Sequence, residues 1–145
     1  MSDRGRARGW ALQGMYAWEA RNAIPEEMVR VLLDLFATLR VSPRNRTFAE
    51  VLVRLVSVNL PRVDRMIEES LTNWKMSRLS MVDRNILRLG VAELMFVDEV
   101  PPRTTVREMV SLAEKFGTGE SARFVAGVLD AVAKKLAPGQ GAAGA

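Results

Sequence analysis

The sequence of 145 residues contains no cysteine and no histidine. Those absences exclude disulfides, zinc or iron sites built on Cys and His, and the Ser-His-Asp and Cys-His nucleophiles. Histidine is also the usual acid–base group near neutral pH. Only carboxylate or lysine chemistry remains open. The composition therefore favours a protein that is not an enzyme and that needs no cofactor and no metal.

Other common signatures are missing as well. The ten glycines form neither a G-x-G-x-x-G nor a G-K-[ST] pattern, which are the usual phosphate-cradling loops. No run approaches the roughly 20 apolar residues of a membrane helix. The N-terminus also lacks the unbroken apolar run of a secretory signal. The simplest interpretation is a cytoplasmic protein without membrane contact.

The charge is modestly basic, and its distribution is more informative than its total. The chain has 21 Lys and Arg against 17 Asp and Glu, a formal charge of +4. The excess is densest at the N-terminal tip, residues 1–9, where Arg4, Arg6 and Arg8 alternate with other residues. Such a tip is either an ordinary solvated terminus or an arginine-rich segment that contacts RNA phosphates. The residues alone leave both interpretations open.

The periodicity is helical almost throughout, which predicts an all-α domain of about seven helices over residues 1–137. Capping boxes at Thr47, Ser80 and Thr105 predict helix starts. Pro61 is expected to kink or end the helix that begins at Thr47, because proline removes a backbone donor. The Gly/Ala-rich residues 138–145 carry no charge and little bulk and are expected to be disordered.

The segment before the last predicted helix also has two interpretations. The run 116–121, Phe-Gly-Thr-Gly-Glu-Ser, fits a C-cap followed by an N-cap. The same helix start could instead attract a phosphate to its free N–H groups, with Arg123 one turn away and Glu120 opposing. Phe124 lies in the apolar stripe, where an aromatic side chain more often serves the core than a nucleotide base.

The order of residues resembles the NusB family of transcription antitermination factors. The central run, residues 74–89, reads Trp-Lys-Met-Ser-Arg-Leu-Ser-Met-Val-Asp-Arg-Asn-Ile-Leu-Arg-Leu and is followed by Glu93-Leu94. Two further segments match in order and spacing, at 98–117 and 123–130, as does the opening Arg-rich helix. The resemblance runs from about residue 4 to residue 136 and is weakest between 23 and 63.

The resemblance implies an all-α fold of two small helical bundles and a binding function without catalysis. In that family the protein pairs with NusE, a small-subunit ribosomal protein, and together they hold boxA RNA. The complex joins elongating RNA polymerase, with other Nus factors, and supports antitermination, notably in ribosomal RNA operons.

The resemblance also implies site residues. Arg4, Arg6 and Arg8 match positions that meet RNA phosphates, and a second RNA-contacting patch matches Glu120, Arg123 and Phe124. The RNA interpretation expects these two places to lie on one face. Positions expected near NusE match Tyr16, Asp83 and Arg84.

Three residues depart from the family pattern. Ala126 stands where Asn is usual, Arg107 replaces another Asn, and Pro61 interrupts a stretch that is normally helical.

Two rival functions stay open: a NusB-like domain of a ribosomal RNA methyltransferase, or a helical protein-interaction module that binds no RNA. Monomer and homodimer both fit the residue pattern.

Overall fold

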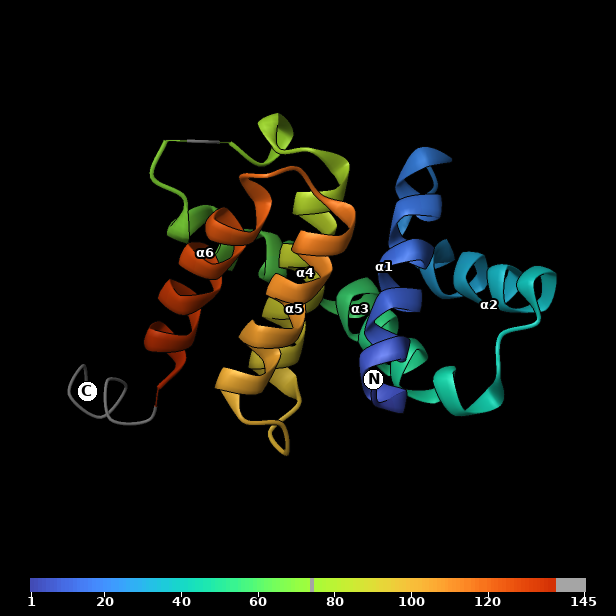
Figure 1. The fold of residues 1–145 in the computed structure, drawn as a ribbon. Helices are drawn as coiled ribbons and strands as arrows, with labels where there is room; N and C mark the ends of the chain where they lie inside the picture. Colours follow the sequence, from blue (N-terminus) through green and yellow to red (C-terminus); the bar gives the residue numbers. More distant parts are fainter. Residues whose placement is uncertain (74, 138–145) are drawn as a thin grey trace.

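The computed structural model describes residues 1–73 and 75–137, and these are helical with no strand (Figure 1). The six α-helices are α1 (Asp3–Ala20), α2 (Met28–Leu39), α3 (Thr47–Ser70), α4 (Met81–Phe96), α5 (Pro102–Phe116) and α6 (Ser121–Leu136). Short 3-10 turns precede α2, α3 and α4. The all-α prediction is confirmed, and the expected count of about seven was approximate. The predicted disordered tail, 138–145, lies outside the described residues.

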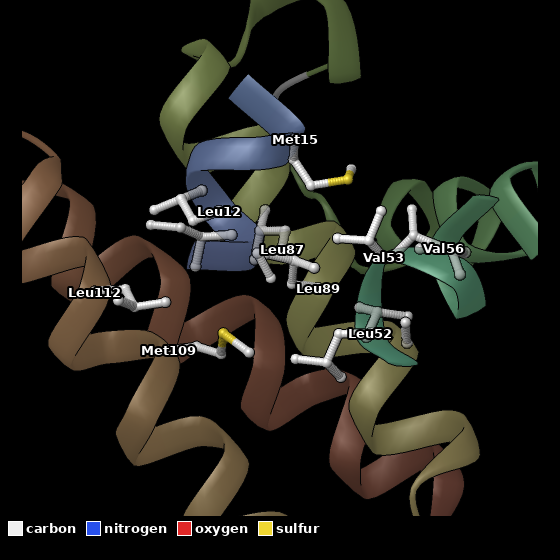
Figure 2. Packing of buried hydrophobic residues seen from close by; sticks show 14 of the residues in the cluster. Leu12, Met15, Leu52, Val53, Val56, Leu87, Leu89, Met109 and Leu112 are labelled. Atoms are coloured by element: carbon white, nitrogen blue, oxygen red, sulfur yellow. The ribbon is translucent and has the colours of Figure 1, made fainter. Parts of the chain in front are cut away.

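The helices form two groups that share a core. The first group is α1 to α3 and the second is α4 to α6, and both α1 and α3 also pack against α4. Figure 2 shows apolar side chains from both groups meeting around Leu87 and Leu89 of α4. Every residue from 85 to 93 is buried, so α4 is the central helix. A Cβ on Gly90 would lie 2.8 Å from Leu129 Cδ1, so glycine here lets α6 approach closely.

Two of the three predicted helix starts are confirmed, and the third is wrong. Ser80 caps α4 as predicted, since its hydroxyl accepts a hydrogen bond from the Asp83 N–H at 3.1 Å. α3 begins at Thr47 as predicted, although its N-cap position is Arg46 and no side-chain hydrogen bond caps it. α5 begins at Pro102, before the predicted Thr105, because the fixed φ of proline suits a first turn. Thr105 is instead buried inside the helix.

Pro61 bends α3 without ending it. The helix continues to Ser70, and the backbone departs from helical geometry at Asn59, with φ −117° and ψ 20°. The Asn59 side-chain amide donates a hydrogen bond to the Leu55 carbonyl, one turn earlier, at 2.8 Å. The predicted kink is therefore confirmed, two residues before the proline.

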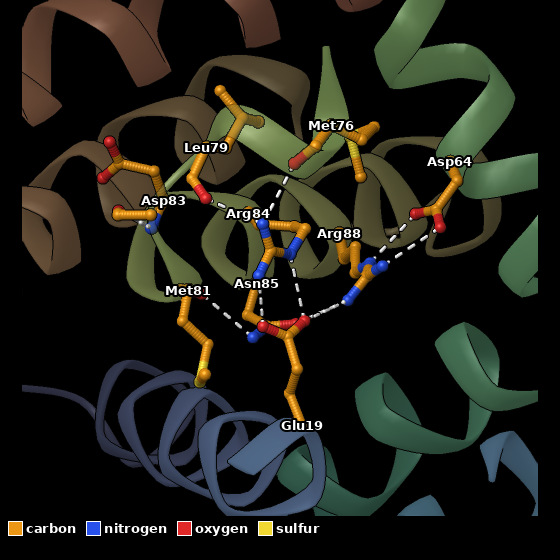
Figure 3. Close-up of polar contacts among 10 residues, drawn as sticks. Glu19, Asp64, Met76, Leu79, Met81, Asp83, Arg84, Asn85 and Arg88 are labelled. Atoms are coloured by element: carbon orange, nitrogen blue, oxygen red, sulfur yellow. Dashed lines mark hydrogen bonds and ion pairs between the residues drawn. The ribbon is translucent and has the colours of Figure 1, made fainter. Parts of the chain in front are cut away.

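A network of ion pairs joins the two groups of helices at one end of α4 (Figure 3). Glu19 of α1 accepts hydrogen bonds from Arg84 and Arg88 of α4, and Arg88 also binds Asp64 of α3 at 2.9 Å. Burial raises the pKa of Glu19, but the hydrogen bonds and charges of Arg84 and Arg88 outweigh it. The pKa of Glu19 consequently lies below its ordinary value.

This pKa shift predicts a pH-dependent contribution of Glu19 to stability. A depressed carboxyl pKa stabilises the fold above the unfolded value of about 4.3, and this contribution is lost as pH falls through the lower folded value. The free energy of unfolding of the parent should exceed that of Glu19→Gln most at pH 6–7, and the gap should shrink below about pH 4. Urea unfolding of both proteins across this range checks the prediction. A gap that stays constant down to pH 3 would contradict it.

Among residues 1–73 and 75–137, no helix is long and apolar enough to cross a membrane. Over the same residues, no group of three or more acidic side chains is placed to hold a metal ion.

Candidate nucleic-acid interface

A cavity of about 360 Å³ opens where the starts of α4 and α6 meet. It is lined by Arg78, Leu79, Ser80, Asp83, Glu120, Arg123 and Phe124. The first four belong to the segment that leads into α4 and to its first turn, and the others to the start of α6. The structure thus brings together the second predicted RNA patch and Asp83, which the resemblance assigned to NusE.

The loop before α6 has a local reason for its shape. The Ser121 hydroxyl accepts a hydrogen bond from the Thr118 N–H at 3.0 Å, which turns the chain into the helix. A Cβ on Gly117 would lie 2.4 Å from Ser121 Oγ, so only glycine fits beside this turn. The interpretation of residues 116–121 as a cap-to-cap connection therefore agrees with the structure, and the turn fixes the position of Arg123 and Phe124.

The cavity has the chemistry of a site for single-stranded nucleic acid. The Arg78 and Arg123 side chains are exposed and can reach phosphates, while Phe124 is half-buried and can offer part of its ring to a base. Glu120 and Asp83 place acceptor groups at the same opening. Asp83 Oδ1 is buried without a hydrogen-bond partner among the described residues.

The three N-terminal arginines have different surroundings. Arg4 is exposed, lies over the Phe48 ring at 4.4 Å and pairs with Glu99 at 3.0 Å. Arg6 is exposed and lies 3.8 Å from Asp3. The Arg8 side chain, in contrast, is only 3% exposed. The predicted phosphate contact fits the positions of Arg4 and Arg6 but does not fit the burial of Arg8.

The buried Arg8 side chain of α1 forms ion pairs with both α4 and α5. Its Nε donates to Glu93 Oε2 of α4 at 3.0 Å, and its Nη1 donates to Glu108 Oε1 of α5 at 3.2 Å. Glu93 is fully buried. The sequence could have indicated this pair, because Glu93 stands in the most apolar run of the chain. A carboxylate buried there needs a cationic partner.

The N-terminal tip and the start of α6 do not line one cavity. Arg4 contacts Glu99, which lies between α4 and α5, whereas Arg78 and Arg123 lie where α4 and α6 begin. Figure 1 shows these places at opposite ends of α4. The two arginine groups therefore do not form one site, and their common face stays a prediction.

The residues predicted to contact NusE have different surroundings. Tyr16 is 47% exposed on α1. The Arg84 guanidinium is engaged inside the protein, where it donates to the carbonyls of Met76 and Leu79 at 2.9 and 2.7 Å and binds Glu19 (Figure 3). Arg84 therefore holds the turn that forms one wall of the cavity.

Comparison with known proteins gives the family. The NusB family matches residues 5–134. The transcription antitermination protein NusB of Geotalea daltonii is 38% identical over 141 residues, covering 94% of this chain and 97% of that protein. A structure of T. maritima NusB superposes with a TM-score of 0.84 at 32% identity, covering 94% of both chains. A structure of antitermination factors NusB and NusE in complex with dsRNA gives 0.81 at 31% identity, covering 92% of this chain and 98% of the matched one. The chain belongs to the NusB family.

Proposed function

We propose that this chain is a transcription antitermination factor that holds boxA-type single-stranded RNA together with NusE. It acts on elongating RNA polymerase in the cytoplasm, including during ribosomal RNA transcription. The observation that carries the proposal is the cavity between α4 and α6, where two exposed arginines and a half-buried phenylalanine meet in a member of the NusB family. The structure of NusB and NusE in complex with dsRNA gives a precedent for NusE as the partner and for RNA, there double-stranded, as the ligand.

In this proposal the RNA is bound by attraction of phosphates and by contact with an unstacked base. Arg78 and Arg123 neutralise phosphates, and Phe124 contacts the base. Arg4 and Arg6 add phosphate contacts at the other end of the strand, while Arg8 serves the fold. The protein positions RNA and partner and catalyses no reaction.

We assign Tyr16 and Asp83 to the contact with NusE. Tyr16 offers a large exposed ring, which is a frequent anchor in protein interfaces. Asp83 lies at the edge of the RNA cavity, so a partner that reaches it would touch protein and RNA together. Such a shared boundary explains why the two proteins would bind RNA better as a pair than separately.

The proposal is tested by a gel shift of boxA-type RNA with this protein alone, with NusE alone and with both. We expect the pair to bind most tightly, and binding to weaken between low and moderate salt because phosphate contacts release counterions. Binding that does not change with salt would contradict the phosphate mechanism. Recovery of NusE in a pull-down without any RNA shift would favour the protein-interaction alternative. The methyltransferase-domain alternative is less favoured, since the relative from Geotalea daltonii, 38% identical to this chain, is named as an antitermination protein.

A further inference from the structure

The short turn before α4 carries Arg78 to the rim of the cavity. It is one 3-10 turn, Met76–Arg78, closed by a hydrogen bond from the Leu79 N–H to the Met76 carbonyl at 3.2 Å. The Met76 and Leu79 side chains are buried, whereas Arg78 is exposed. Hydrogen bonds in 3-10 turns have poorer geometry than those in α-helices. The position of Arg78 therefore depends on what else holds the turn.

The Arg84 side chain binds this turn and α1 at the same time (Figure 3). Its Nη1 donates to the Met76 carbonyl at 2.9 Å and to the Leu79 carbonyl at 2.7 Å, so it holds both ends of the turn. Its Nε donates to Glu19 Oε1 at 3.0 Å, and its Nη2 donates to Glu19 Oε2. The planar fork of a guanidinium allows all these bonds together.

These contacts leave Arg84 little to offer a partner directly. Its side chain is only 16% exposed, and the protein itself occupies its donors on two sides. The neighbouring Arg78 is exposed and lines the cavity. A change at Arg84 can therefore reach RNA through the turn, by moving Arg78.

We propose that Arg84 is a positioning residue for RNA binding at the cavity. It fixes the turn through the Met76 and Leu79 carbonyls, so that Arg78 faces a phosphate, and Glu19 orients the Arg84 guanidinium. This inference rests on the proposed RNA-binding function and extends it to the junction between the two groups of helices. The affinity of the cavity thereby depends on an ion pair whose carboxylate belongs to α1.

Arg88 distinguishes this role from stabilisation of the fold in general. It lies one turn further along α4 and shares Glu19, to which its Nη1 donates at 2.9 Å. Its Nε and Nη2 donate to Asp64 of α3, at 2.9 and 3.1 Å, and Nη1 also donates to Asn85. Loss of the Arg88 fork should therefore disturb the same network without releasing the turn.

The test replaces each arginine by lysine and keeps the charge. In Arg84→Lys a single ammonium cannot span Glu19 and both carbonyls, and Arg88→Lys is the matched control. We expect both variants to fold and to unfold below the parent temperature. With NusE present, Arg84→Lys should weaken binding of boxA-type RNA about three- to tenfold, as for the loss of one hydrogen bond, and Arg88→Lys should bind normally.

A double-mutant cycle with Arg78 identifies the route. Because the turn acts through Arg78, Arg84→Lys should weaken RNA binding by less than about twofold once Arg78 is alanine. A purely structural loss would instead lower affinity equally with and without the Arg78 side chain.

Backbone hydrogen exchange gives a readout that needs no RNA. Arg84→Lys should speed exchange of the Leu79 amide proton relative to the parent and to Arg88→Lys. Unchanged exchange, unchanged RNA affinity or additive effects of Arg84→Lys and Arg78→Ala overturn the positioning role while the proposed function stands. If the parent binds no RNA with NusE, the proposed function fails, and the role of Arg84 in RNA binding fails with it.

Discussion

Replacing Arg8 by alanine is expected to lower the free energy of unfolding by about 3–5 kcal/mol, the cost of leaving a buried charge without its partner. Glu93 is fully buried, and Arg8 donates to both of its oxygens. A typical domain is stable by only about 5–15 kcal/mol, so this loss is a large share of the total. Thermal and urea unfolding of Arg8→Ala against the parent measure it.

Two further variants separate the effect of breaking the buried ion pair from the effect of losing one positive charge. Arg6→Ala removes the same charge two residues earlier from an exposed position and should change stability by less than about 0.5 kcal/mol. The double variant Arg8→Met/Glu93→Leu removes both charges and should recover much of the loss, since apolar replacements of buried ion pairs are often tolerated. If Arg8→Ala unfolds like Arg6→Ala, the structural role of Arg8 is refuted.

Phe124→Leu is expected to weaken binding of boxA-type RNA, in the presence of NusE, by about 5- to 150-fold. Stacking of a base on an aromatic side chain contributes about 1–3 kcal/mol. Leucine retains the apolar volume that Phe124 packs against the core, so the fold should survive the substitution. The measurement is an RNA titration at fixed salt, with the unfolding temperature of each protein checked beside it.

The control for this prediction is Phe36→Leu, a change of the same type at a fully buried position of α2. It should lower stability without weakening RNA binding by the protein that remains folded. Equal affinities for the parent and Phe124→Leu would mean that Phe124 serves only the core, the alternative that the apolar periodicity had favoured.

Much of the fold could be predicted from the sequence because apolar periodicity is a local signal. The helix around Leu87 and Leu89 carries the densest apolar run of the sequence, and every residue from 85 to 93 is buried. Helix starts were less predictable, because Thr105 satisfies a capping pattern although α5 already begins at Pro102. The kink at Asn59 followed from the chemistry of Pro61.

The site was only partly predictable because it depends on contacts between distant segments. Glu120, Arg123 and Phe124 are neighbours in sequence and do meet in one cavity. Arg8 looked identical to Arg4 and Arg6, and only its pairing with Glu93, 85 residues away, separates it from them. Likewise, no local pattern places Asp83 beside Arg123.

The central claim is that particular arginines, rather than the net charge of +4, attach this protein to RNA. The most direct test is the salt dependence of boxA-type RNA binding, with NusE, for the parent, Arg123→Ala and Arg30→Ala. Arg30 is an exposed arginine of α2 and provides the matched loss of charge. We predict that Arg123→Ala reduces the slope of log affinity against log salt by about 0.7–1, as expected for one lost phosphate contact, while Arg30→Ala keeps the parent slope. Equal slopes for the two variants would contradict the account.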